Sequence, residues 1–531
     1  MSVTRKIAVI HPIFLSLYFV VFFYSQNTWL FFWPDPFIAA GIIISATLFL
    51  FYIFARLLRD YKKGGLLISL SLLIFFSYGH IINSLKSLAG GAVRIRYVML
   101  GLGLIYVFSA YVISRTRRDL ARITKVLNLV AIFLVLIPSF QIGVQAYQTS
   151  VIGKKFNKDS SIQDNNPITQ PLSNLPDIYY IILDAYAHQE TLKDSFGYSN
   201  DEFYSFLQEK GFYIASESNS NYGYTMLSLP SSLNMRYLDD LVEKYGSLAA
   251  TLSGNTATLR YMMEDNEIQR FLKSRGYKFI YVSSGSFAPT SVNRSADVNF
   301  SWDLTRSLFV RNDFIVSLLR ETFLLGPLYL DKRVGSTYSG DGEGVLYAFD
   351  RLREMPALPS ANPVFVFAHI LSPHPEFTLD RECNIIPQSQ IPVTEGTASI
   401  KPYLEKLICT NKRLEEFIDQ ALATSKTPPI IILQSDHGFG SGKTSLPPKI
   451  ETREDIPPEI AREYLRNFNA YYLPDGGNEI LYPSITPVNS FRLVFNYYFN
   501  TSFELLEDKS YFLPNEQRIY QLFDVTDYVT F

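Results

Sequence analysis

Cysteine is nearly absent from this chain, since only Cys383 and Cys409 occur among its 531 residues. So few cysteines exclude a disulfide framework and a cysteine-rich metal site. At most one bridge can form. One bridge in an oxidising compartment and two buried free thiols are equally compatible with the sequence.

Acidic residues are scarce in the first 142 residues, which hold only Asp35, Asp60 and Asp119 beside 14 lysines and arginines. The rest of the chain carries 34 basic and 47 acidic side chains. The net charge of -2 therefore hides a basic N-terminal part followed by an acidic part. The basic residues lie in short clusters between apolar runs and form no extended patch, so no nucleic-acid partner is expected.

Apolar runs dominate the N-terminal part, and each is about as long as the roughly 20 residues that cross a bilayer core. The five runs cover residues 8–25, 37–55, 65–84, 97–114 and 126–142. Four runs follow the first one, and no small-residue cleavage site is evident, so the first run is interpreted as a retained helix and not as a secretory signal. Residues 1–142 are thus predicted to form an α-helical membrane bundle of five spans.

The basic residues of this part flank alternate loops. Eleven would lie on one side of the membrane: Arg5, Lys6, Arg56, Arg59, Lys62, Lys63, Arg115, Arg117, Arg118, Arg122 and Lys125. Only Lys86, Arg94 and Arg96 would lie on the other. The positive-inside rule then predicts a multi-pass protein of the inner (plasma) membrane, with its N-terminus in the cytoplasm and residues after 142 outside it.

The pattern changes after the membrane part. Residues 143–176 are polar, show no sustained period and are predicted to form a linker. In residues 177–531, short apolar runs rich in β-formers alternate with helical stretches. The predicted strands are Ile178–Leu183, Phe279–Val282, Val364–Ile370 and Ile430–Leu433, and the clearest helices are 200–211, 264–275 and 401–424. This alternation is typical of an α/β domain with a mostly parallel sheet covered on both faces.

Polar residues follow three of the predicted strands. Asp184 follows the first strand, His369 and His374 lie at the end of the third, and Asp436 and His437 follow the fourth. Ligands of parallel sheets bind beyond the carboxyl ends of the strands. Carboxylates and imidazoles are ligands of Zn²⁺ or Mn²⁺, although a single Asp at a strand end more often caps the next helix. Three such strand ends together favour a metal site.

The order of these motifs resembles that of the alkaline phosphatase and sulfatase superfamily. The motifs are Ile-Ile-Leu-Asp184, Gly-Tyr-Thr225-Met-Leu-Ser-Leu-Pro, Ser-Pro-His374-Pro-Glu-Phe and Ser-Asp436-His437-Gly-Phe-Gly. The resemblance covers about residues 177–500, and the plan of five spans before an external domain is similar to that of the membrane-anchored phosphoethanolamine transferases and lipoteichoic acid synthases. It implies an alkaline phosphatase-like fold for residues 177–531, which would be an extracytoplasmic catalytic domain.

The resemblance also implies roles for individual residues. Asp184, Thr225, Asp436 and His437 would hold one divalent ion, Zn or Mn, and Thr225 would also be the catalytic nucleophile. His374 would bind the substrate at its transferred or leaving group.

The roles of His369 and Thr225 have alternatives. His369 could bind substrate, belong to a second metal site or be a core histidine with satisfied hydrogen bonds. The alternative for Thr225 is a helix-capping threonine, and Tyr224 is the competing hydroxyl.

The chain departs at two points from the families that it resembles. The transferase branch usually has Glu as the first ligand, whereas this chain has Asp184, as the nucleotide pyrophosphatases and other superfamily members do. True sulfatases make formylglycine from a Cys or Ser followed by x-Pro-x-Arg, and neither Cys383 nor Cys409 lies in that context, so formylglycine chemistry is excluded.

The leading functional hypothesis is an enzyme that moves a phospho-substituent from a membrane lipid donor to an envelope glycan or lipid acceptor. The alternatives are a sulfatase-like hydrolase of phosphate or sulfate esters and a non-catalytic envelope scaffold. The spans lack paired charges, which argues against a transporter.

Overall fold

The computed structural model describes most of the chain. The described residues are 8–28, 31, 35–88, 94–160, 175–238, 241, 257–285, 288–302, 313–320, 322, 341–387, 390–391, 396–515 and 518–531. They fall into two compact units: an N-terminal unit from residues 1–147 and 307–337, and a C-terminal unit from residues 148–306 and 338–531. Arg5 and Lys6, which the topology prediction uses, lie outside the described residues.

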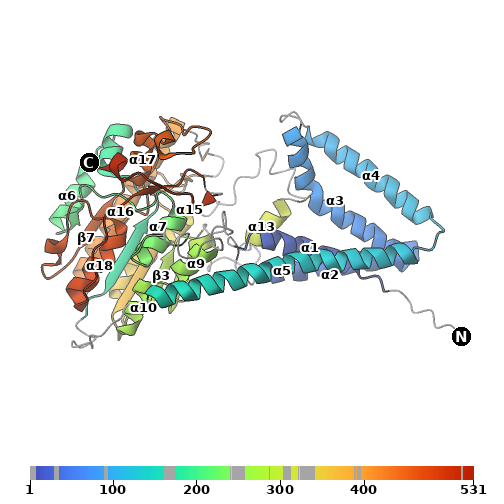
Figure 1. Ribbon diagram of the computed structural model, residues 1–531, viewed down its shortest axis with the longest axis horizontal. Coiled ribbons are helices and arrows are strands. Elements are labelled where there is room, and N and C mark those ends of the chain that lie inside the picture. Colours follow the sequence, from blue (N-terminus) through green and yellow to red (C-terminus); the bar gives the residue numbers. More distant parts are fainter. Residues whose placement is uncertain are drawn as a thin grey trace. The chain divides into compact units, whose positions relative to one another are not determined.

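Five apolar helices occupy the positions of the five predicted runs (Figure 1). They are α1 (His11–Gln26), α2 (Asp35–Leu58), α3 (Tyr61–Leu88), α4 (Ile95–Arg115) and α5 (Ala121–Ser160). Within the described part of the chain, α2 to α5 are long and apolar enough to cross a bilayer. Helix α1 has 16 residues, or about 24 Å, which is less than the roughly 30 Å of a bilayer core. Helix α5 continues to Ser160, so the predicted linker 143–176 begins as helix.

The outward faces of these helices are apolar. Phe49 on α2, Phe108 on α4 and Phe140 on α5 are 65%, 70% and 74% exposed. Polar groups form hydrogen bonds between helices. His11 Nδ1 lies 2.7 Å from Ser69 Oγ, and Asn128 Oδ1 accepts the His11 backbone N–H. Apolar side chains facing out and polar side chains paired inside are what a lipid surrounding requires.

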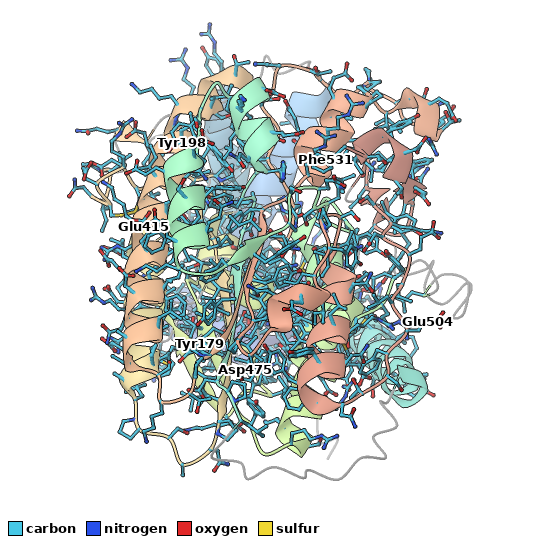
Figure 2. All side chains as sticks on the ribbon, turned by 90° about the vertical axis from the view of Figure 1, so that its left-hand side faces the viewer. Tyr179, Tyr198, Glu415, Asp475, Glu504 and Phe531 are labelled. Carbon is cyan, nitrogen blue, oxygen red and sulfur yellow. A yellow bond between two sulfur atoms is a disulfide. The ribbon has the colours of Figure 1, made fainter. Side chains whose placement is uncertain are left out.

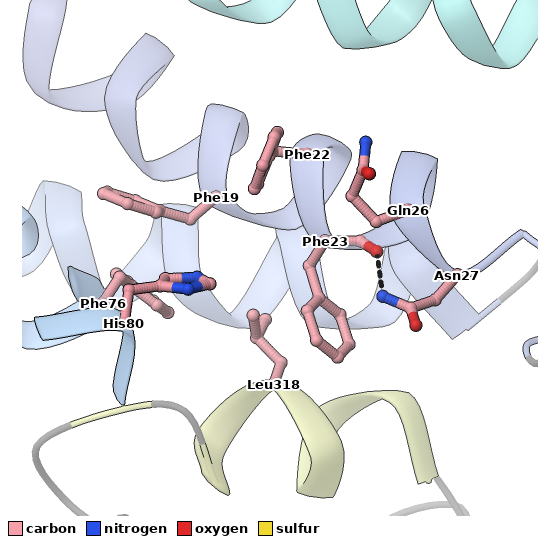
Figure 3. Close-up of a pocket in the computed structure, with 8 residues that line it drawn as sticks. All are labelled: Phe19, Phe22, Phe23, Gln26, Asn27, Phe76, His80 and Leu318. Atoms are coloured by element: carbon pink, nitrogen blue, oxygen red, sulfur yellow. Dashed lines mark hydrogen bonds between the residues drawn. The ribbon is translucent and has the colours of Figure 1, made fainter. Parts of the chain in front are cut away.

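One short helix from far along the chain packs in the N-terminal unit. Helix α13 (Asp313–Arg320) lies against α2, and the buried Phe314 ring packs edge-on against Phe23 and Phe31. Leu318 of α13 lines a cavity of about 280 Å³ with side chains of α1 and α3 (Figure 3). The other lining residues are Phe19, Phe22, Phe23, Gln26, Asn27, Phe76 and His80. The contribution of residues after 300 to this unit was not predicted.

A seven-stranded sheet forms the centre of the C-terminal unit, in the order β2-β7-β6-β1-β5-β3-β4. Its strands are β1 (Ile178–Leu183), β2 (Tyr213–Ile214), β3 (Lys278–Ser283), β4 (Val298–Ser301), β5 (Val364–Ile370), β6 (Ile430–Gln434) and β7 (Asn469–Tyr472). The pairs from β6 through β1, β5 and β3 to β4 are parallel, whereas β7 is antiparallel to both neighbours. The four predicted strands are β1, β3, β5 and β6, so the mostly parallel sheet is confirmed.

Helices cover both faces of this sheet. Successive side chains of a strand point to opposite faces, so each strand contributes to two cores. Tyr180 and Ile182 of β1 belong to a core with α7 (Thr225–Leu233), α9 (Ala257–Glu264), α10 (Glu267–Ser274) and α18 (Pro487–Phe499). Tyr179 and Ile181 belong to a second core with α6 (Asp201–Glu209), α15 (Asp341–Glu354) and α16 (Ile400–Thr424). Figure 2 shows Tyr179 inside the unit and Glu504 at its edge. The doubly covered α/β fold is thus confirmed.

Two pairs of smaller elements complete the described part of the unit. Helix α17 (Pro458–Leu465) packs with α19 (Thr526–Val529), and β8 (Tyr511–Phe512) forms a hairpin with β9 (Phe523–Asp524). Both belong to the C-terminal region that follows the last predicted strand.

Candidate metal and catalytic site

The sheet brings the predicted site residues to one edge. Strand β1 lies between β5 and β6 and runs parallel to both, so the carboxyl ends of the three strands are neighbours. Asp184 directly follows β1, and its backbone N–H donates to Ile370 O at the end of β5. Asp436 and His437 follow β6. The parallel register therefore places these side chains together.

Asp184, Asp436 and His437 form a compact buried cluster. One ligand atom from each lies within 4.8 Å of the others. His437 Nε2 is 3.6 Å from Asp184 Oδ1 and 3.6 Å from Asp436 Oδ2. Both of these carboxylate oxygens are buried without a hydrogen-bond donor. Buried polar atoms nearly always have a partner, so two orphaned oxygens facing one imidazole nitrogen fit a cation.

Supporting hydrogen bonds orient these groups toward one another. Asp436 Oδ1 accepts the backbone N–H groups of Ala185 and His437, which leaves Oδ2 for the cluster. His437 Nδ1 lies 2.7 Å from Gly438 O, and a carbonyl can only accept, so Nδ1 carries the proton. Nε2 then presents its lone pair to the cluster, as in a metal-binding histidine. Ala185 has a left-handed φ of 60°, a strained conformation directly after Asp184.

The motif glycine has a steric reason. A Cβ at Gly438 would collide with the carbonyl oxygen of Glu463, and its backbone N–H donates to Tyr464 O. The chain after His437 therefore lies too close to α17 for any side chain.

Charges within the cluster shift its pKa values in opposite directions. Burial would raise the pKa of Asp184, but His374, His369 and His437 hold it below its ordinary value. Burial and the neighbouring Asp184 carboxylate raise the pKa of Asp436. Although burial opposes it, Asp436 and Asp184 raise the pKa of His437. The cluster thus favours positive charge between its two carboxylates.

Thr225 reaches this cluster from helix α7. Its Oγ1 lies 3.3 Å from His437 Nε2. Thr225 is buried and is the first residue of α7, while the N-cap is Tyr224. Thr225 is therefore not a capping threonine, and Tyr224 packs on the apolar core that includes α7. The positive end of the helix dipole lies at Thr225, where it favours anionic groups.

His369 lies deeper than His374. It is a buried residue of β5, with Nδ1 2.8 Å from Thr290 Oγ1 and Nε2 3.2 Å from Asp184 Oδ2. Its Nε2 has no hydrogen-bond partner in spite of this short distance. His369 thus lies beside the cluster.

His374 lies in the loop after β5. Its side chain is half-buried, and its backbone N–H donates to Asp184 O. Its charge also contributes to the lowered pKa of Asp184. The structure therefore brings together all six predicted site residues, and the individual roles of these residues remain predictions.

Two supporting residues were not predicted. Thr290 lies in the short 3-10 helix Ala288–Thr290 and hydrogen-bonds His369, and nothing in the linear sequence marks it. Lys406 is fully buried on α16. Lys406 lies three or four residues from Tyr403 and Thr410, which are also buried, and next to buried Leu407. A lysine on the buried face of a predicted helix was the signal in the sequence that could have identified it.

Cys383 and Cys409 form a disulfide, with their Cα atoms 5.1 Å apart. Of the two alternatives left open by the sequence, the structure supports the bridge. It joins the loop that follows His374 to helix α16.

No family model matches the chain, and no curated protein matches it in sequence. Solved structures do match. One is the C-terminal periplasmic domain of EcEptC from Escherichia coli in complex with Zn, at 11% identity over 67% of this chain and 94% of that chain, with a TM-score of 0.42. Another is the lipoteichoic acid synthase LtaP from Listeria monocytogenes, at 14% identity over 68% and 83%, with a TM-score of 0.38.

A third match extends into the N-terminal unit. The integral membrane protein lipooligosaccharide phosphoethanolamine transferase A from Neisseria meningitidis is 13% identical over 91% of this chain and 94% of that chain, with a TM-score of 0.35. At these identities and TM-scores the likeness carries no argument about activity. The function is therefore argued from the residues of the site.

Proposed function

We propose that this chain is a membrane-anchored, metal-dependent enzyme that transfers a phospho-substituent from a membrane lipid to an envelope glycan or lipid through a covalent intermediate on Thr225. The observation that carries the proposal is the convergence of two orphaned carboxylate oxygens and one imidazole lone pair beside the Thr225 hydroxyl. The motif resemblance supports the same reading.

Asp184, Asp436 and His437 would hold one divalent ion, and the Thr225 hydroxyl would complete a set of four donors. Two carboxylates, one imidazole and one hydroxyl suit Zn²⁺ or Mn²⁺. Such an ion favours the alkoxide form of a bound hydroxyl and offsets charge on a phosphoryl group. The fit rests on the two buried oxygens, which have no hydrogen-bond donor of their own.

The residues of the chain would then act in two steps. The Thr225 hydroxyl loses its proton as Oγ attacks the phosphorus of the donor, and the P–O bond to the lipid alcohol breaks as the leaving oxygen takes up that proton. The backbone N–H groups at the start of α7 would stabilise the phosphoryl oxygens. His374 would hydrogen-bond the leaving oxygen. A hydroxyl of the acceptor then attacks the same phosphorus, the bond from phosphorus to Thr225 Oγ breaks, and the proton of the acceptor hydroxyl returns to Thr225.

A location outside the cytoplasm is part of this proposal. The loop between α4 and α5 carries Arg117 and Arg118, and the positive-inside rule assigns it to the cytoplasm. Since α5 is long enough to cross, the chain after α5 lies outside whether or not the short helix α1 spans the bilayer. Donor and acceptor would then meet at the outer surface of the membrane.

The test is a comparison of envelope lipids and glycans by mass spectrometry. Cells with the wild-type chain should contain a phospho-substituted lipid or glycan that is absent from cells lacking the chain and from cells with Thr225→Ala. A plain hydrolase, the second candidate, would release the same group as a free phosphomonoester and leave no substituted acceptor. Identical profiles in all three strains contradict both.

A further inference from the structure

Helix α16 carries a buried polar stripe. Tyr403, Lys406 and Thr410 are buried, and their spacing of three and four residues places them on one face of the helix; Asn411, which follows Thr410, is also buried. Buried lysines are rare because a charged group loses its hydration. Four polar side chains in the interior therefore need a structural or functional reason.

Lys406 binds the loop that carries His374. Its Nζ donates to Leu371 O at 2.8 Å, to His374 O at 2.9 Å and to Glu376 O at 3.0 Å. An ammonium has three protons, and these three carbonyl oxygens match them. The three carbonyls come from one turn of chain on both sides of His374. Charge-assisted hydrogen bonds are about twice as strong as neutral ones, so Lys406 holds this turn firmly.

The neighbours of Lys406 on the stripe hold both site loops. Thr410 Oγ1 donates to Lys406 O, so the Ser372 hydroxyl at 2.6 Å donates to Thr410. One turn earlier, Tyr403 OH donates to Ala185 O and accepts from Ala187 N–H, directly after Asp184. The two loops also join each other, since His374 N–H donates to Asp184 O.

We infer that Lys406 is a positioning residue for the reaction: its ammonium fixes the 371–376 loop so that His374 meets the reacting group. This inference rests on the proposed function for its kinetic consequence, but not for its structural one. In these three bonds Lys406 binds backbone carbonyls of the loop that carries His374, so its effect on the reaction is expected to pass through His374. A misplacement of about 1 Å in a catalytic group can cost roughly 100-fold in rate.

The main experiment substitutes Lys406→Met in the full-length protein, which keeps the stem of the side chain and removes the ammonium. Turnover should fall about 10- to 100-fold through kcat, with KM within about threefold and metal content unchanged. The matched control is Lys412→Met on the same helix. Lys412 is partly exposed and pairs with Glu382 at 2.7 Å, so its loss should leave kcat within about twofold.

A double-mutant cycle separates positioning from general stability. If Lys406 acts through His374, Lys406→Met should cost less than about threefold in a His374→Ala background. The same fold loss in both backgrounds overturns the inference. If Lys406→Met does not fold, Thr410→Val decides in its place, because it removes the Ser372 contact to the same loop and, besides that, the intrahelical bond to the Lys406 carbonyl. A loss that disappears with His374→Ala supports the inference, and a loss that persists overturns it.

Hydrogen exchange tests the structural part without any activity. Amides of residues 371–377 should exchange at least about tenfold faster in Lys406→Met than in Lys412→Met, because three carbonyl anchors are lost. Unchanged exchange overturns the inference even if the enzyme is active. Faster exchange in a protein whose wild type shows no metal-dependent turnover supports the positioning by Lys406 and refutes the proposed function instead.

Discussion

Thr225 Oγ1 lies 3.3 Å from His437 Nε2, although the two residues are 212 positions apart in the chain. In the neutral imidazole, whose other nitrogen donates to Gly438 O, Nε2 can accept a hydrogen bond from the Thr225 hydroxyl. The same nitrogen faces Asp184 and Asp436. The Thr225 hydroxyl therefore shares one small volume with the donor atoms that fit a cation.

Removing one carboxylate should release the metal. Asp436→Asn replaces the carboxylate with a neutral amide, which is a poor metal ligand. Bound Zn or Mn, measured by plasma mass spectrometry, should therefore fall at least about tenfold. Asp177→Asn is the matched control. Asp177 lies at the opposite end of β1, where its Oδ1 accepts the Val364 N–H, and an asparagine can accept the same bond. Full metal content in Asp436→Asn would remove this residue from the proposed ligand set.

The C-terminal unit should face away from the cytoplasm. A reporter that is active only outside the cytoplasm should give signal when fused after Phe531, and a reporter fused at Arg117 should not. The reason is that Arg117 belongs to the basic loop between α4 and α5. Activity only in the cytoplasm for the first fusion would reverse the orientation.

The Cys383–Cys409 bridge should form in the mature protein and stabilise it. Peptides from unreduced protein should contain the linked pair. The bridge closes a loop of 26 residues, for which chain entropy gives about 3.5 kcal/mol at 25 °C. A double Cys→Ala variant should therefore unfold at lower temperature than the wild type. Two free thiols in the exported protein would contradict the prediction.

His188 should make the fold sensitive to acid. Burial, with a smaller effect of Arg466, lowers the pKa of His188 from 6.5 to about 3, so the folded protein holds this imidazole neutral. Its stabilising effect is fully present above pH 6.5 and is lost as pH falls toward 3. At pH 4.5 the loss is roughly 2–3 kcal/mol.

The test uses His188→Asn, which keeps an acceptor for the Glu190 N–H that now binds His188 Nδ1. Thermal unfolding at pH 7 and pH 4.5 should show a smaller acid-induced drop in the variant than in the wild type. Equal drops would show that His188 is not the acid-sensitive group.

Apolar pattern explains which elements the sequence could predict. Strands β1, β3, β5 and β6 are continuous apolar runs in the middle of the sheet, and each was predicted within one residue at either end. The edge strands were missed because they are short and mixed, as in Val298–Ser301. Helix α13 was missed for another reason. Its eight residues are amphipathic like any surface helix, and only the tertiary structure shows that Phe314 packs on helices some 290 residues earlier.

The site divides in the same way. Asp184, Asp436 and His437 were predictable because parallel strands bring their carboxyl ends to one edge. Thr290 and Lys406 act through contacts between segments that are distant in sequence, and neither side chain is part of a local motif.

The central claim is that Thr225 is the nucleophile, and the most direct measurement is mass spectrometry of the protein quenched during turnover with a phosphodiester donor. A phospho-substituent should be found on Thr225 in the wild type, and Thr225→Ala should lose at least about 1,000-fold in kcat. Tyr224→Phe is the control and should keep activity and the adduct. Activity of Thr225→Ala within about tenfold of the wild type, together with an inactive Tyr224→Phe, would contradict the account.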